Sequence, residues 1–101
     1  MSTPEPSDFT EWASWFKCLA DGTRLRILHF VATAPNPVTV GEIVDEIGMS
    51  QSTVSRHLQV LAEQRFVFAE PDGVRTMIRA NEKCMIELPE AAEALMGRST
   101  G

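Results

Sequence analysis

The segment between residues 39 and 61 constrains the fold more than any other part of the chain, because it reads as two short helices separated by a glycine. Thr39 and Glu42 match a capping box, in which two side chains satisfy backbone N–H groups at the start of a helix. Gly48 is suited to end this helix in a left-handed conformation, and Ser50 can cap the next one. The pattern therefore predicts two helices joined by a tight turn.

Each of these two helices has an apolar stripe at helical spacing and can bury one face. The stripes are Ile43, Val44 and Ile47 in the first helix, and Val54, Leu58 and Leu61 in the second. Opposite its stripe, the second helix carries polar side chains that point outward. The outward residues are Gln51, Ser52, Ser55, Arg56 and Gln59.

Two helices are expected before this pair. Apolar residues recur at spacings of three and four between Phe9 and Leu19, which predicts an unusually aromatic first helix. Asp21 can cap a second helix through its carboxylate, and the proline-containing segment 34–37 ends it. Residues 38–40 then leave room only for a very short strand.

Beyond the paired helices the pattern changes from helical to extended. Residues 66–69 and 74–80 read as two strands, which predicts a β-hairpin with its turn at Asp72 and Gly73. The hairpin is the only substantial β-structure that the pattern predicts.

A last helical segment is expected from Asn81, which can cap it, to Gly97. Pro89 should break or restart it, because proline lacks the backbone N–H that a helix needs. The full order is mainly α with a small β-hairpin, which is typical of a winged helix-turn-helix domain. The predicted divisions are a flexible N-terminus at 1–7, the winged helix-turn-helix domain at 8–97 and a flexible C-terminus at 98–101.

Composition and charge restrict the possible functions. Hydrophobic residues make up 44% of the chain and charged residues 23%, and no apolar run reaches the roughly 18 residues of a membrane span. The N-terminus lacks the basic and apolar regions of a signal peptide, so we expect a cytoplasmic protein with no membrane partner. The formal charge of −5 opposes non-specific, salt-dependent binding to DNA phosphates more than it opposes base-specific recognition of a short DNA site.

The outward face of the second paired helix suits the major groove of DNA. Glutamine can donate to and accept from a base edge, arginine can bridge a guanine, and serine or threonine can reach phosphates. A polar stripe alone is more often a solvated face, but the surrounding order of elements favours DNA. The predicted DNA-binding residues are Ser50, Gln51, Ser52, Thr53, Ser55, Arg56, Gln59 and, in the hairpin, Arg75.

Two motifs resemble those of ArsR-type metal-responsive repressors. Residues 17–28 are similar to that family's alanine, aspartate, proline, threonine-arginine motif, with Gly22 in the place of the common proline. Residues 49–61 resemble the family's recognition helix. The resemblance implies a homodimer that binds an inverted-repeat operator in double-stranded DNA and releases it when an effector binds.

The resemblance also implies that the first and last helices form the dimer interface. The aromatic first helix agrees with this, because it carries more apolar surface than so small a core is expected to bury within one subunit. The predicted interface residues are Trp12, Trp15, Phe16, Leu19 and Leu95.

The family's two common metal sites are missing from the matching positions. Residues 42–48 contain no cysteine, and residues 81–97 contain no histidine. Cys18 and Cys84 remain, on the helices that the resemblance packs together. They are either small core residues or a soft-metal effector site, for which Hg(II) suits two thiolates better than As(III) or Cd(II).

Other functions follow less well from the residues. The chain has no glycine-rich phosphate loop, nucleophile elbow or HExxH motif, so we expect neither an enzyme nor a required cofactor. Thiol oxidation or an organic ligand can replace metal as the signal. A winged helix that contacts only proteins, with no DNA target, is the second alternative. His29 and His57 are expected to be packed or hydrogen-bonded rather than metal ligands.

Overall fold

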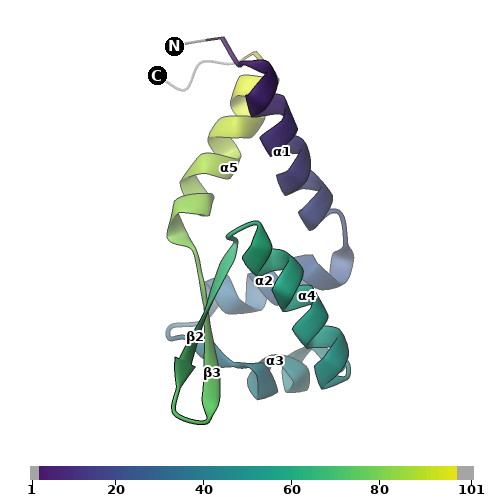
Figure 1. Ribbon diagram of the computed structural model, residues 1–101, viewed down its shortest axis with the longest axis vertical. Helices are drawn as coiled ribbons and strands as arrows, with labels where there is room; N and C mark the ends of the chain where they lie inside the picture. Colours follow the sequence, from purple (N-terminus) through teal and green to yellow (C-terminus); the bar gives the residue numbers. More distant parts are fainter. Residues whose placement is uncertain (1–2, 98–101) are drawn as a thin grey trace.

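The computed structural model describes residues 3–97, and the C-terminal segment predicted to be flexible, 98–101, lies outside the described residues. Figure 1 shows a lower body that contains the hairpin and the central helices, with two helices rising from it. The elements are α1 (Pro6–Leu19), α2 (Gly22–Thr33), β1 (Val38–Thr39), α3 (Val40–Ile47), α4 (Gln51–Glu63), β2 (Val67–Asp72), β3 (Arg75–Ala80) and α5 (Glu82–Leu95). This order confirms the predicted winged helix-turn-helix architecture.

Side-chain caps begin the helices where the sequence predicts them. The capping residues are Asp21 for α2, Thr39 for α3, Ser50 for α4 and Asn81 for α5. At α3 the capping box is complete, because Thr39 Oγ1 accepts from the Glu42 N–H at 3.1 Å and Glu42 Oε1 accepts from the Thr39 N–H at 3.1 Å. Local hydrogen bonding therefore accounts for these helix boundaries.

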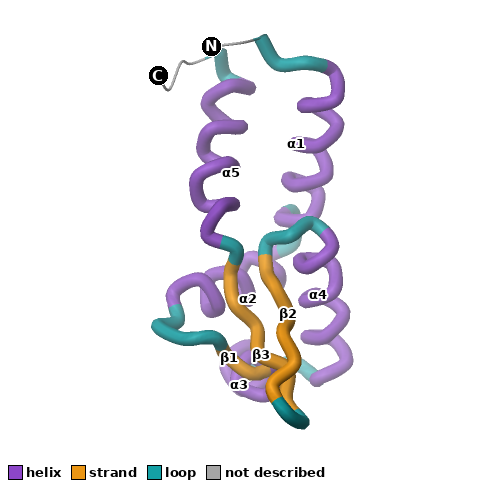
Figure 2. Tube along the Cα trace, turned by 60° about the vertical axis from the view of Figure 1, so that its left-hand side comes forward, coloured by secondary structure: helices purple, strands orange, loops and turns teal. Residues whose placement is uncertain are grey.

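The sheet has three antiparallel strands in the order β1-β3-β2 (Figure 2). Asp72 pairs with Arg75, so the turn residues are Gly73 and Val74, and the predicted turn at Asp72 and Gly73 was wrong by one position. Gly73 has φ 66°, a conformation that glycine adopts without a steric penalty. Pro71 fits inside β2 because β2 is an edge strand, where a missing N–H costs no ladder bond on the open side.

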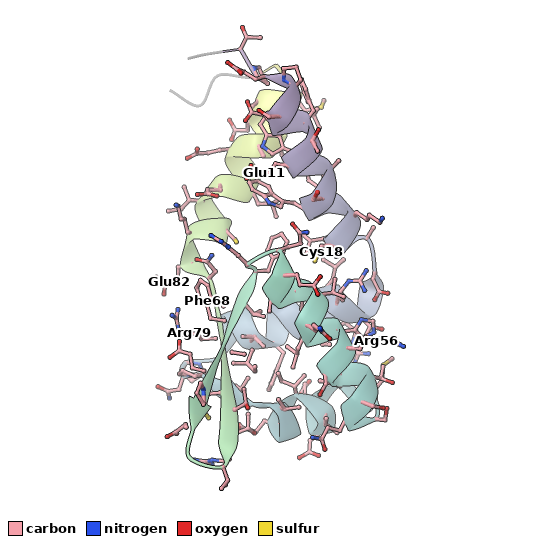
Figure 3. All side chains as sticks on the ribbon, viewed as in Figure 1. Glu11, Cys18, Arg56, Phe68, Arg79 and Glu82 are labelled. Carbon is pink, nitrogen blue, oxygen red and sulfur yellow. The ribbon has the colours of Figure 1, made fainter. Side chains whose placement is uncertain are left out.

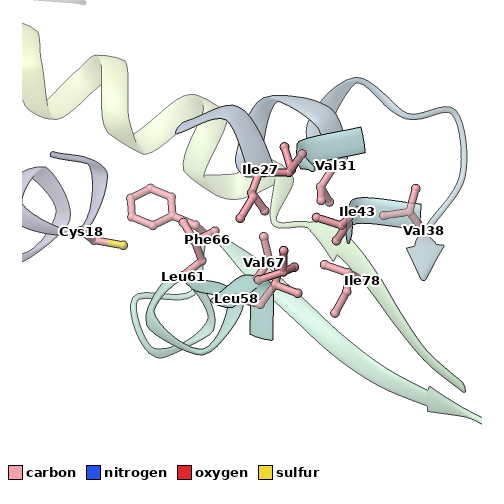
Figure 4. Close-up of a cluster of buried hydrophobic side chains, with 12 residues drawn as sticks. Cys18, Ile27, Val31, Val38, Ile43, Leu58, Leu61, Phe66, Val67 and Ile78 are labelled. Atoms are coloured by element: carbon pink, nitrogen blue, oxygen red, sulfur yellow. The ribbon is translucent and has the colours of Figure 1, made fainter. Parts of the chain in front are cut away.

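The hydrophobic core joins the helices of the body to the inner strand (Figure 4). Ile27 on α2, Ile43 on α3, Leu61 on α4 and Ile78 on β3 are almost completely buried. These residues lie on the apolar faces that the helical and strand patterns define. The core thus packs α3 and α4 of the helix-turn-helix against each other and against the sheet.

The helices α1 and α5 extend away from this core on the same side of the molecule (Figures 1 and 2). Cys18 is the only buried residue of α1, and Ala91 of α5 is also buried. The outer parts of both helices therefore present side chains that the described chain does not cover.

The structure departs from the predictions at both of these helices. α1 begins at Pro6, within the segment 1–7 predicted to be flexible, and proline at the first helical position supports that start. The prediction that Pro89 breaks the last helix was wrong, since α5 is continuous from Glu82 to Leu95. Pro89 is exposed, so water can bond the carbonyl that its missing N–H leaves without a donor.

Candidate nucleic-acid interface

The turn between α3 and α4 sets the angle at which the second helix is presented. Gly48 ends α3 with φ 78° and donates its N–H to the Val44 carbonyl at 2.9 Å. Ser50 then caps α4, its hydroxyl accepting from the Thr53 N–H at 3.2 Å. The helix-turn-helix follows from these contacts, because the left-handed cap reverses the chain within a few residues.

The predicted reading face of α4 points outward. Its exposed residues are Gln51, Ser52, Ser55, Arg56 and Gln59, preceded by exposed Ser50. Thr53 is half-buried, and its Oγ1 accepts a hydrogen bond from the Ser50 hydroxyl at 2.9 Å. Ser50 and Thr53 thus shape the start of the helix, and the Ser52 hydroxyl lies 3.2 Å from that of Ser50. The other exposed side chains of the face have no hydrogen bond within residues 3–97 and can meet a base edge.

Arg56 carries the unpaired positive charge of this face. Figure 3 shows it on the outer side of α4. Within residues 3–97, neither Arg56 nor Arg75 takes part in a salt bridge, and both are exposed. An exposed guanidinium without a carboxylate partner can bind a guanine edge or a phosphate without first breaking an ion pair.

Arg79, the other arginine of the hairpin, is held by its own strands. Its guanidinium lies 4.5 Å from the centre of the Phe68 ring and forms a salt bridge with Glu70 across the β2–β3 ladder (Figure 3). These contacts direct Arg79 toward β2. Arg75, beside the turn, is therefore the hairpin arginine available to DNA.

Sequence reasoning missed a polar junction between α1, α2 and α4. His57 is 9% exposed, as expected for a packed histidine, and its Nδ1 lies 3.3 Å from Nη1 of Arg24. Arg24 also donates from Nε to the Cys18 carbonyl at 2.6 Å. The position of Arg24 in the first turn after the Asp21 cap is a sequence signal for this role, but the contact with His57 depends on tertiary packing.

The two cysteines lie in separate environments. Cys18 Sγ donates to the Val60 carbonyl at 3.8 Å, and Cys84 Sγ donates to the Arg65 carbonyl at 3.2 Å. Burial raises the pKa of the Cys18 thiol, an effect that the Arg24 charge opposes and Glu63 reinforces. Burial and then Glu87 raise the pKa of Cys84.

These environments provide soft sulfur donors but no assembled metal centre. The cavity beside Cys18 is not lined by Cys84, and the two cavities beside Cys84 are not lined by Cys18. The described residues also contain no group of three or more His, Cys, Asp or Glu side chains placed to hold a metal. Thiols with raised pKa values must also lose a proton before they bind a metal. The assignment of Cys18 and Cys84 to a metal stays a prediction.

The predicted dimer residues divide into two groups. Trp15 and Leu19 are partly buried and pack against the subunit's own core. Phe16 and Leu95 are 38% and 51% exposed, and half-buried Trp12 meets Phe9 edge to face with ring centres 5.5 Å apart. Phe9, at 46% exposure, adds to the uncovered apolar surface and was not among the predicted interface residues.

Known proteins similar to this chain are transcriptional regulators. Residues 21–68 match the family described as bacterial regulatory protein, arsR family. A probable mercury resistance operon repressor from Streptomyces lividans is 34% identical over 83 residues, covering 82% of this chain and 65% of the relative. An HTH-type transcriptional regulator from Mycobacterium tuberculosis is 40% identical over 60 residues, covering 59% of this chain and 54% of the relative. The chain thus spans less than two thirds of the length of either relative.

The fold of this chain is also similar to that of solved structures of regulators. The homodimeric winged helix-turn-helix DNA-binding domain of a possible ArsR-family regulator from Mycobacterium bovis is 25% identical, with a TM-score of 0.72. The likeness covers 100% of this chain and 94% of that domain. Among the described residues, no helix is long and apolar enough to cross a membrane. The chain belongs to the ArsR family of bacterial regulatory proteins, which are DNA-binding transcriptional regulators rather than enzymes.

Proposed function

We propose that this regulator is a cytoplasmic repressor that binds an inverted-repeat operator as a homodimer. The observation that carries the proposal is the outward polar face of α4, with Arg56 near its middle and Arg75 beside the hairpin turn, both without a salt bridge within residues 3–97. A two-fold dimer places two such helices in successive major grooves, roughly 34–36 Å apart.

The uncovered surface of α1 and α5 supports the homodimer. Phe9, Phe16 and Leu95 are exposed apolar side chains on helices that extend beyond the core. A second copy of the chain that packs its α1 and α5 on this surface would bury them, and burial of apolar area drives association. The similar M. bovis domain is homodimeric, which supports a dimer without specifying its interface.

The proposed effector is a thiophilic metal ion, Hg(II) first, in a metal-resistance type of regulation. The name of the S. lividans relative and the preference of soft ions for sulfur support this choice. Cys18 and Cys84 are the proposed ligands, in a site completed between subunits. Each thiol would lose its proton to solvent and form a sulfur–metal bond, which releases the carbonyl of Val60 or Arg65 that it now bonds.

Selection of binding sites from random-sequence DNA tests the DNA-binding proposal. We expect the wild-type chain to enrich duplexes that contain an inverted repeat, and a footprint with two-fold symmetry on them. Failure to enrich any duplex would instead favour a winged helix that contacts only proteins.

Titration of the selected complex tests the effector. We expect Hg(II) to release DNA at lower concentrations than As(III), Cd(II) or Zn(II), and Cys18→Ser or Cys84→Ser to raise the concentration required. Affinity for Hg(II) should also rise with pH through the thiol range, because ligation displaces protons. Release of DNA from both serine variants at the wild-type Hg(II) concentration would remove the cysteines from the site. Release by peroxide or an organic ligand alone would identify a different signal.

A further inference from the structure

One side chain, Arg24, contacts three helices. Its Nε donates to the Cys18 carbonyl at the end of α1 at 2.6 Å, and its Nη1 lies 3.3 Å from Nδ1 of His57 on α4. The same Nη1 lies 3.9 Å from the Asp21 carboxylate at the start of α2. Because the guanidinium is planar and rigid, the position of one partner restricts the positions of the others.

We propose that Arg24 is a positioning residue that sets the orientation of α4 relative to α1, and so determines which half-site spacing the dimer accepts. The inference rests on the proposed function, in which α1 belongs to the dimer interface and α4 reads DNA. The inference adds that the Arg24 side chain fixes the position of α4 relative to α1 within each subunit.

Few other hydrogen bonds join α1 to the rest of the described chain. Among residues 3–97, the hydrogen bonds that tie α1 to other elements both involve Cys18: its carbonyl accepts from Arg24, and its thiol donates to Val60 at 3.8 Å. Thiols are weak donors, whereas a guanidinium makes a charge-assisted bond. The side chain of Arg24 is 18% exposed, so solvent competes little for its donors. Arg24 therefore supplies the stronger polar restraint on α1.

The contact of Arg24 with α4 adjoins the reading face. Arginine can only donate, so Nδ1 of His57 is the acceptor in this contact. His57 directly follows Arg56 in the helix. A rotation of α4 that displaces the imidazole therefore also changes the direction of Arg56.

The shape of the subunit amplifies such a rotation. The molecule is 46 Å along its longest axis, with α1 and α5 at one end and the helix-turn-helix at the other (Figure 1). A small change of angle where α1 joins α2 thus moves the far end of α4 by a larger distance. In a dimer that displacement changes the separation of the two recognition helices, which must match about one turn of DNA.

The test uses a duplex selected by the wild-type chain, rebuilt with its half-sites one or two base pairs closer together or farther apart. The variants are Arg24→Met, which loses the donors, His57→Leu, which loses the acceptor but fills the core, and His57→Gln, which keeps an acceptor. We expect the wild type to prefer its own spacing by about tenfold or more, a difference of at least one decade in Kd. Arg24→Met and His57→Leu should bind all spacings within about threefold, and His57→Gln should restore much of the preference.

Sedimentation and thermal unfolding of the variants distinguish a positioning role of Arg24 from a general role in keeping the subunit folded and dimeric. We expect His57→Leu to remain a folded dimer while it loses its spacing preference. Retention of the wild-type preference by folded His57→Leu would overturn the inference, even if Arg24→Met is too unstable to assay. If the wild type selects no inverted repeat, the proposed function itself is overturned. If the wild type has a spacing preference that no variant changes, only the positioning role of Arg24 is overturned.

Discussion

Replacement of Arg56 by alanine should weaken operator binding without weakening the fold. Arg56 is exposed on α4 and has no salt bridge within the described residues, so its removal leaves no carboxylate unpaired. Exposed substitutions of this kind change the free energy of unfolding by roughly 0.5 kcal/mol or less. The effect should therefore fall on DNA affinity alone.

The expected size follows from one bidentate contact in each half-site. Loss of an arginine contact to guanine costs about 1–3 kcal/mol. A dimer carries the change twice, so even the lower limit amounts to about 2 kcal/mol on a full operator, or about a 30-fold increase in Kd. Discrimination at the contacted base pair should decrease together with affinity.

The matched control is Arg26→Ala, which removes the same charge from an exposed position on α2. Fluorescence anisotropy on one duplex at constant salt compares the two variants, and urea unfolding checks their stability. If Arg56→Ala binds within about threefold of Arg26→Ala, Arg56 acts only through its charge and makes no base contact.

Three further changes test the wing, the dimer surface and a helix cap. Arg75→Ala should lower affinity for all sequences and reduce the slope of log Kd against log salt by about one unit if Arg75 binds a phosphate, and an unaltered slope would contradict that role. Trp12→Glu should yield monomers that no longer bind the operator, because it places a charge on the apolar surface of α1, and a variant that still sediments as a dimer would reject this interface. The pKa of Asp21 is lowered, mainly by the hydrogen bond from the Arg24 N–H and also by the Arg24 charge. Its ionised form thus stabilises the fold fully above the unfolded pKa of about 3.9 and loses that effect as pH falls through the lower folded value, so Asp21→Asn should flatten the acid side of the stability curve measured by urea unfolding.

Local chemistry made much of the fold predictable. The caps at Asp21, Thr39, Ser50 and Asn81 and the left-handed Gly48 involve residues only a few positions apart, so the sequence contains both partners. The outward face of α4 was predictable for the same reason, since helical periodicity determines which side chains are buried.

Features that depend on distant partners were not predictable in this way. The pairing of Val38 with Ile78 and the contact of Arg24 with His57 join segments that no local pattern connects. The continuity of α5 through Pro89 depended on which side of the helix faces solvent. Arg65 adopts φ 62°, a left-handed conformation, while its carbonyl accepts from both Asn81 and Cys84, and no turn residue in the sequence indicates this.

The pairing of β1 with β3 has a consequence for how the reading elements lose their structure. Val38 precedes α3, and its partner Ile78 lies in the inner strand of the hairpin, so this pair closes a chain loop that contains both helices of the helix-turn-helix. Opening the pair removes the contact that closes this loop, so buried contacts of α3 and of the hairpin are lost together. Amide protons of β3 that bond to β1 and those in the middle of α3 should therefore exchange with solvent through one shared opening event, whereas amides near the hairpin turn exchange through smaller local fluctuations.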